Sequence, residues 1–247
     1  MIQHNVEYGF VNNETQIQAK NIFKKAQKIF FVAERNLKVL ERQLTCKLSN
    51  AYIVQNPVNL KSITRLKWPD DRIIKFAVVA RLDIDYKGQD LLLEAFSDLH
   101  WQKRTFQLNL FGEGPSKEYL QELIKYYNLA DKVFLKGHFE SIENIWEDHH
   151  LLILPSHSEG TPLALLEAMR CGRPAIVTDV GDNAKWIKNG VNGYVVPCAS
   201  GSALNEVLEK AWSEKKNWEI MGQQSFNIIQ EKFIENPEQL LLSHILS

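Results

Sequence analysis

The sequence predicts an α/β protein built on a parallel, doubly wound sheet. From about residue 72 onward, short apolar runs rich in β-branched residues alternate with longer segments of helical periodicity. Strands that alternate with helices form right-handed βαβ units, so that neighbouring strands run parallel. Ligands of such sheets bind beside the carboxyl ends of the strands, which directs attention to the loops that follow each strand.

The predicted strands are short apolar runs, and the first of them, IIKFAVVA at residues 73–80, has the character of a buried strand. Five further runs follow it along the chain. The strands are expected at residues 73–80, 106–112, 132–137, 151–156, 174–179 and 193–197.

The predicted helices lie between and after these strands. In TPLALLEAMRCG, Thr161 suits the N-cap, Pro162 the first helical position and Gly172 the C-terminal stop. The helix at 88–100 carries an apolar stripe of Leu91, Leu92, Ala95, Phe96 and Leu99. The helices are expected at residues 88–100, 116–129, 141–149, 161–172, 183–190, 203–213, 216–233 and 237–246.

Residues 1–71 follow a different pattern. We expect a polar helix from residue 16 to 28, a strand at 28–33, the helix ERNLKVLERQL and a strand near 51–55. The tripeptide NPV that follows breaks this pattern as a linker would. With so few strands, this segment is expected to lack a core of its own. We interpret this segment as the edge of another domain or as an extension that packs around the main domain.

Composition is that of a globular protein with a buried core, because 45% of residues are hydrophobic and 24% are charged. The formal net charge of −1 argues against nucleic acid as a partner. Residues 1–70 contain 11 Lys and Arg residues and 5 Asp and Glu residues. The basic segment at 20–47 could therefore contact a membrane surface or nucleic acid, and a solvated helix face is the alternative.

Sequence features also indicate the cellular compartment. Cys46, Cys171 and Cys198 lie far apart without zinc spacing or a C-x-x-C pattern, which indicates free thiols in a reducing compartment. No apolar run approaches the ~18–20 residues that cross a bilayer, and the N-terminus lacks the features of a signal peptide. We expect a cytoplasmic protein, with peripheral contact at the inner membrane face left open.

Two glutamates lie close to the start of the helix at 161–172. Glu159 lies just before that helix, whose free N–H groups and positive dipole end form an anion site at the sheet edge. Glu167 lies inside the helix among apolar residues, so it needs a partner. Spacing alone leaves two alternatives: a pair with Arg170, or a carboxylate that accepts hydrogen bonds from hydroxyl groups of a ligand.

Two cations lie at the carboxyl edge of the predicted sheet. Arg81 ends the first strand and Lys87 precedes the next helix, where the two side chains could bind a diphosphate. Solvated loop cations are the alternative. The turn GEGP contains Gly112 and Gly114, which let backbone approach a ligand, and it is too short for a dinucleotide motif.

No metal site is expected. Asp83 and Asp85 form an Asp-x-Asp motif like that of some metal-dependent glycosyltransferases, but Arg81 and Lys87 already supply positive charge. His149 and His150 flank a strand start without a carboxylate partner, as loop or core histidines do. We therefore expect the protein to need no cofactor.

Five stretches taken together resemble the retaining glycosyltransferases of family 4, also called group 1, which have the GT-B fold. Within the fourth stretch, Glu159 and Glu167 form the E-x7-E pair of that family. The resemblance covers roughly residues 73–197 and implies a Rossmann-like sheet, the C-terminal half of a GT-B enzyme. The matching stretches are VARLDIDYKGQDLLLEAF, LNLFGEGP, VFLKGHFE, LLILPSHSEGTPLALLEAMRCGRPAIVTDVGDNAKWI and NGVNGYVV.

The resemblance implies catalytic roles for Arg81, Lys87 and Glu159. Arg81 and Lys87 resemble the pair that binds the donor diphosphate, Glu159 resembles the carboxylate on the donor sugar, and Glu167 the one on the ribose diol. The remaining donor-binding positions that the resemblance implies form the backbone cradle at the helix start, the glycine turn and the nucleobase region: Gly160, Thr161, Pro162, Leu163, Gly112, Gly114, Gly137 and His138.

The chain departs from the family pattern in two respects. Asp182 and Lys185 stand where many members have glycine and glutamate, and Thr161 replaces a common aromatic residue, which puts sugar preference in question. The other departure is length, because nearly all of the N-terminal acceptor domain is absent. We expect residues 1–60 to be a remnant of that domain with its linker, 61–215 the donor-binding domain, and 216–247 helices that cross back.

The function implied is transfer of a hexosyl group from a nucleotide-sugar, with UDP or GDP, to a glycan or lipid-linked acceptor. This chain would be the donor-binding part, inactive alone, in a fragment or a truncated reading frame. A non-catalytic nucleotide-sugar binding module or partner subunit is the alternative, and a GT-B epimerase is a third. An apolar surface left by the missing N-terminal domain would leave homodimerisation open.

Overall fold

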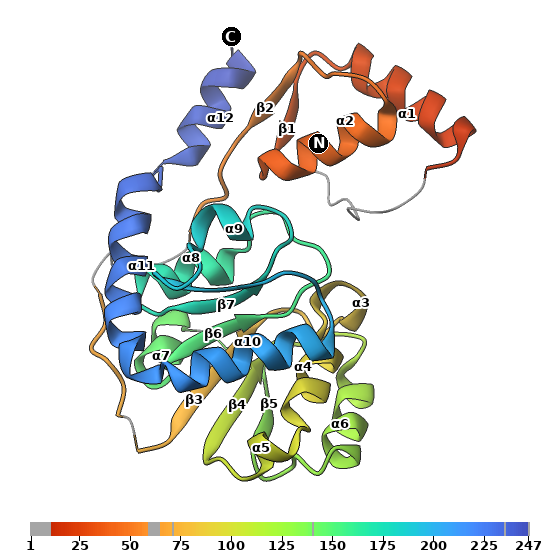
Figure 1. Cartoon of the computed structure of the whole chain (residues 1–247). Helices are drawn as coiled ribbons and strands as arrows, with labels where there is room; N and C mark the ends of the chain where they lie inside the picture. The colour runs from red at the N-terminus through yellow and green to blue at the C-terminus, as the bar shows by residue number, and fades with distance from the viewer. Residues whose placement is uncertain (1–10, 59–64, 71, 140, 235, 247) are drawn as a thin grey trace.

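Six parallel strands form the main sheet of the computed structural model (Figure 1). The structure describes residues 11–58, 65–70, 72–139, 141–234 and 236–246. Each strand lies within two residues of the position predicted from its apolar run at either end, and the predicted α/β fold is confirmed. The strands are β3 (Ile74–Val79), β4 (Phe106–Phe111), β5 (Val133–Gly137), β6 (Leu151–Leu154), β7 (Ala175–Thr178) and β8 (Gly193–Val196).

The order of strands across the sheet is β5-β4-β3-β6-β7-β8. The chain moves outward from β3 to β5, returns to place β6 against the other side of β3, and then moves outward again to β8. The strand order therefore reverses between β3 and β6. In open α/β sheets, the crevice beyond the carboxyl ends of the strands at such a reversal is where ligands bind.

Helices cover both faces of this sheet because successive side chains of each strand point to opposite faces. Phe76 and Val78 of β3 belong to one apolar cluster, whereas Ala77 belongs to the other. The first cluster includes residues of α4 (Gln89–Phe96), α5 (Leu99–Gln102), α6 (Lys117–Tyr126) and α10 (Gly201–Ser213). The second includes residues of α7 (Ile142–Asp148), α8 (Leu163–Arg170), α9 (Asn183–Trp186) and α11 (Trp218–Lys232).

Two predicted helices differ markedly in the structure, and one short helix was not predicted. The single helix expected at 88–100 is two helices, because the Asp98 side chain accepts the N–H of His100 and starts α5. Leu99 is consequently 68% exposed instead of lying on the apolar stripe. The helix expected at 183–190 ends at Trp186, and the loop after β3 contains a short helix, α3 (Ile84–Lys87), that was not predicted.

The N-terminal segment forms one βαβ unit of its own. β1 (Ile29–Phe31) and β2 (Ala51–Ile53) pair in parallel through α2 (Glu34–Leu44), with α1 (Asn13–Lys25) packed beside α2. The expectation that this segment lacks a core was wrong, because the unit encloses a small apolar cluster. Its buried members are Phe23, Ile29, Phe31, Leu40, Leu44 and Leu48.

The C-terminal helix α12 (Pro237–Leu246) lies beside this two-stranded sheet (Figure 1). The Lys28 ammonium donates to the carbonyl of His244, and the rings of Tyr52 and His244 are 4.6 Å apart between centroids. The C-terminal helix therefore packs against the N-terminal unit, although the two are far apart in sequence. The division of the chain at residues 60 and 215 stays a prediction.

Arg173, which follows α8, joins several segments from inside the protein. Its guanidinium is 1% exposed and donates to the carbonyls of Trp146 (2.6 Å), His149 (2.9 Å) and Lys67 (2.7 Å), among others. Burial lowers the pKa of Arg173 to about 10, so the side chain stays charged at neutral pH. It therefore holds the segment before β3 and the end of α7 in place.

Replacing Arg173 with lysine is expected to lower the free energy of unfolding by about 2–4 kcal/mol, because an ammonium cannot reach carbonyls on so many sides and leaves buried acceptors unpaired. Denaturant titration measures this change. Arg72→Lys is the matched control, since its side chain is exposed and bonds to Asp70 nearby in the chain. Equal stability of the two variants would contradict the assigned role.

Candidate functional site

The loops after β3 and β6 lie together at the reversal of strand order. Gly88, which ends α3, has a φ of +59°, and a Cβ atom there would lie 2.3 Å from the carbonyl oxygen of Pro155. Only glycine allows this backbone approach without strain. The contact places the residues of α3 beside the segment that leads into α8.

Lys87 and Glu159 form an ion pair across these two loops. The Lys87 ammonium and the Ser156 hydroxyl each donate to Oε1 of Glu159 at 2.7 Å. Glu159 is only 4% exposed, and a buried carboxylate is stable only when it is paired and hydrogen-bonded. The carboxylate of Glu159 is therefore fixed in position, and one lysine can act on both Glu159 and a ligand beside it.

A cavity of about 390 Å³ opens beside this ion pair, and we call it the Arg81 pocket. The side chain of Arg81 is 67% exposed and approaches Asp83 at 3.7 Å, so its fork of donors can reach a ligand. Sequence reasoning predicted six further lining residues: Lys87, Glu159, Gly160, Thr161, Pro162 and Leu163.

The start of α8 forms one wall of the Arg81 pocket, but its cap is not the predicted one. Pro162 is the N-cap residue, without a side-chain hydrogen bond to the helix, and the first helical residue is Leu163. The hydroxyl of Thr161 instead donates to the carbonyl of Val32 at 2.8 Å. The N-cap side chain therefore makes no hydrogen bond to the first N–H groups of α8. These N–H groups can donate to a bound anion instead.

Glu167 faces a second cavity of about 260 Å³, the Glu167 pocket. Of the two alternatives for Glu167, the pair with Arg170 does not form, because the guanidinium of Arg170 lies over the ring of Phe233, 4.9 Å from its centroid. Within the described part of the chain, no hydrogen bond or ion pair engages the Glu167 carboxylate. Burial raises its pKa to about 7, and the carboxylate of Glu143 adds to this effect.

The two pockets adjoin each other, since both are lined by Val79, Ala80, Leu163 and Ala164. Cations and the fixed Glu159 lie at one end, and the partnerless Glu167 lies at the other, with His138 and Phe139 beside it. An extended ligand with an anionic part and a hydroxyl-bearing part would fit this arrangement.

The glycine turn after β4 shapes the Glu167 pocket. Gly112 lines it with a φ of +137°, and a Cβ atom there would lie 2.1 Å from the carbonyl oxygen of Ala80. Its N–H donates to the carbonyl of Gly137 at 2.8 Å, while Gly114 lies against the backbone of Leu82. The close backbone contacts of Gly112 and Gly114, and a φ of +69° at Gly137, give these positions structural reasons to be glycine, and their contact with a ligand stays a prediction.

Sequence reasoning missed the contribution of the N-terminal unit to the Arg81 pocket. Val32, Asn36 and Asn56 line it from the far side, and the Asn56 amide donates to the carbonyl of Thr161 at 3.3 Å. The side-chain Nδ2 of Asn36 is buried without a hydrogen-bond partner among the described residues. No local pattern marks these positions, because only the packing of the two sheets brings them to the pocket.

Within the described residues, no group of three or more His, Cys, Asp or Glu side chains is arranged to bind a metal ion. His149 is buried, and its ring nitrogens contact Asn109 at 2.8 Å and the carbonyl of Ile145 at 2.7 Å. Burial lowers its pKa to about 4, so it is a neutral core histidine. In the same part of the chain, no helix combines the length and hydropathy needed to cross a membrane.

Comparison with known families now identifies the architecture. The family described as "Glycosyl transferases group 1" matches residues 62–227. The chain belongs to this family. The resemblance inferred from the five motifs is thereby confirmed, as is the fold, because the sheet and its helices match half of a GT-B glycosyltransferase.

Relatives of this glycosyltransferase domain include two transferases from bacteria. The chain is 23% identical over 245 residues to the poly(ribitol-phosphate) alpha-N-acetylglucosaminyltransferase of Staphylococcus aureus. This alignment covers 92% of the chain and 50% of the relative. It is 25% identical over 248 residues to the poly(glycerol-phosphate) alpha-glucosyltransferase of Bacillus subtilis, with 95% of this chain and 36% of the relative covered. The chain thus spans half or less of the length of these relatives.

Among solved structures, Anabaena HepE in complex with UDP-glucose matches 99% of this chain and 71% of its own, with a TM-score of 0.82 and 16% identity. At this identity the likeness shows the fold alone. The glycosyltransferase domain described here therefore shares an architecture with a protein whose complex contains a nucleotide-sugar.

The raised pKa of Glu167 predicts a pH-dependent stability in the absence of ligand. The folded protein keeps a proton that the unfolded chain, with a usual pKa of 4.5, releases. This contribution is full below pH 4.5 and is lost as the pH rises through about 7. Glu167→Gln, which is neutral at every pH, should therefore be more stable than the native protein at pH 8 by about 2–3 kcal/mol.

Denaturant titrations at a series of pH values between 4 and 8 test this dependence. The difference between Glu167→Gln and native protein should grow steadily with pH, whereas Glu122→Gln, at an exposed position on α6, should give a nearly flat difference. If the difference in free energy of unfolding between Glu167→Gln and the native protein also stays constant with pH, the pKa of Glu167 is not raised and the prediction is wrong.

Proposed function

We propose that this glycosyltransferase domain binds the nucleotide-sugar donor of a retaining hexosyl transfer to a glycan or lipid-linked acceptor. The observation that carries the proposal is the pair of adjoining cavities at the reversal of strand order, with cations beside one and the unpaired Glu167 beside the other. A nucleotide-sugar has the matching sequence of groups, because its diphosphate lies between two hydroxyl-bearing sugars.

The proposed roles follow from the contacts of each side chain. Arg81 and Lys87 bind the diphosphate together with the N–H groups at the start of α8, and they stabilise negative charge as the diphosphate departs. Glu159, fixed by Lys87 and Ser156, accepts hydrogen bonds from hydroxyls of the donor sugar. In this role Lys87 orients Glu159 as well as binding phosphate.

Glu167 is proposed to accept hydrogen bonds from the ribose diol. Its carboxylate has no partner within the described chain and faces the cavity, so a pair of ligand hydroxyls would compensate its burial. His138, Phe139 and Gly112 would surround the nucleobase. HepE, which shares this fold, was crystallised with UDP and with UDP-glucose, and the proposal takes uridine as the nucleoside on that basis.

The second candidate is a non-catalytic nucleotide-sugar binding module. The described cavity supports this candidate as well, because its charged groups match the donor alone. Orientation of two bound reactants contributes about 7–11 kcal/mol to a barrier reduction, so a domain that binds one reactant transfers slowly.

Replacing Arg81 with alanine is expected to weaken UDP-sugar binding by about 1.5–3 kcal/mol, the contribution of a charge-assisted hydrogen bond. Isothermal titration calorimetry measures it, and binding should persist in excess EDTA because side chains supply the positive charge. Lys117→Ala, an exposed lysine paired with Glu113, is the control. Unchanged affinity in Arg81→Ala, or loss of binding in EDTA, would remove the assignment of the cations.

Turnover separates the two candidate functions. We expect the 247-residue chain to bind a UDP-sugar but to transfer little sugar to glycan or lipid-linked acceptors, and to gain transfer when an acceptor-binding partner is supplied. Glu159→Gln should abolish that gain. Donor binding with no transfer under any pairing would favour the binding module.

A further inference from the structure

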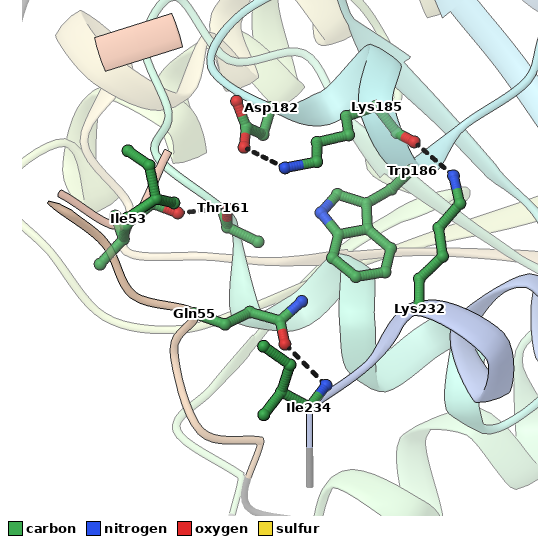
Figure 2. Close-up of a pocket in the computed structure, with 9 residues that line it drawn as sticks. Ile53, Gln55, Thr161, Asp182, Lys185, Trp186, Lys232 and Ile234 are labelled. Atoms are coloured by element: carbon green, nitrogen blue, oxygen red, sulfur yellow. Dashed lines mark hydrogen bonds and ion pairs between the residues drawn. The ribbon is translucent and has the colours of Figure 1, made fainter. Parts of the chain in front are cut away.

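A third cavity, of about 330 Å³, lies on the other side of Val32 and Thr161 from the Arg81 pocket, and we call it the Trp186 pocket (Figure 2). Its walls come from α9, from the end of β2 with Gln55, and from the end of α11 with Ile234. It therefore lies between the two places where the chain passes from one sheet to the other.

The indole of Trp186 points its N–H into this cavity (Figure 2). Trp186 is 3% exposed, and its Nε1 has no hydrogen-bond partner among the residues that the structure describes. A buried N–H without an acceptor is unfavourable, so we expect a bound group to accept a hydrogen bond from it.

Further donors surround the indole. The ammonium of Lys185 lies 3.6 Å from the Asp182 carboxylate at the rim, and the ammonium of Lys232 lies 3.3 Å from the carbonyl of Lys185. Gln55 uses its carbonyl oxygen to accept the N–H of Ile234 at 2.9 Å, which turns its NH₂ group toward Trp186 (Figure 2).

The acceptors in the pocket are already engaged. The Asp182 carboxylate lies 3.4 Å from the N–H groups of Glu34 and Arg35 at the start of α2, in addition to its contact with Lys185. Thr161 donates its hydroxyl proton to Val32. The pocket thus offers two ammonium groups, an indole N–H and an amide NH₂, so its ligand must supply acceptor oxygens and negative charge.

We propose that the Trp186 pocket binds an oxyanion carried by a small molecule, a phosphate ester or a carboxylate, whose oxygens accept from Trp186 Nε1 and Lys185 Nζ. The apolar side chains of Val32, Ile53 and Ile234 would contact its carbon skeleton. The proposal is independent of the nucleotide-sugar site, because Trp186, Lys185 and Gln55 belong to the lining of this pocket and not of the Arg81 pocket.

Indole N–H resonances of ¹⁵N-labelled protein test the proposal directly. The chain has six tryptophans, and Trp186→Phe identifies the resonance of Trp186 by its loss. Titration with inorganic phosphate, glycerol 1-phosphate and glucuronate should shift this resonance in a saturable way, and neutral glycerol should not. The more effective of the phosphate and carboxylate probes identifies the group that the pocket prefers.

Lys185→Gln should weaken this response by about tenfold, the factor that one charge-assisted hydrogen bond contributes. Lys188→Gln, an exposed lysine on the same loop, should leave it unchanged. Saturating UDP should not displace the probe. A Trp186 resonance that stays in place with all three anions, a displacement by UDP, or equal effects of the two lysine variants would overturn the proposal.

Discussion

The buried ion pair between Lys87 and Glu159 joins the two loops on which the site depends. One loop follows β3 and the other follows β6, and the strand order reverses between these strands. Because the glutamate is almost fully buried, the lysine cannot leave it without exposing an unpaired charge to an apolar surrounding. The pair therefore fixes the positions of α3 and of the start of α8, and with them the shape of the Arg81 pocket.

The N-terminal βαβ unit completes the site through polar contacts. Asp182 faces the start of α2, Arg35 forms an ion pair with Asp179 at 2.6 Å, and Thr161 donates to Val32. These contacts come from the loop after β7 and from the segment before α8, so both sheets define the cavities between them. The same junction separates the proposed donor site from the Trp186 pocket, and two ligands could occupy neighbouring positions.

Local sequence predicted much of this architecture because buried parallel strands are continuous apolar runs with clear ends. It failed where a side chain overrides a pattern: Asp98 starts a new helix inside the predicted leucine-rich one, and Thr161 donates to Val32 in place of capping α8. Arg81, Lys87, Glu159 and Glu167 were predicted from motifs, and the structure places them in the walls of two adjoining cavities. The contributions of Asn36 and Asn56 depend on contacts distant in sequence, which periodicity does not encode.

The central claim is that one nucleotide-sugar extends from Arg81 to Glu167, and a crystal structure of the chain with a UDP-sugar tests it most directly. The account predicts the diphosphate within hydrogen-bond distance of Arg81, Lys87 and the first N–H groups of α8, with both ribose hydroxyls on the Glu167 carboxylate. Density for the nucleotide away from these two pockets, or a ribose turned away from Glu167, would contradict the account.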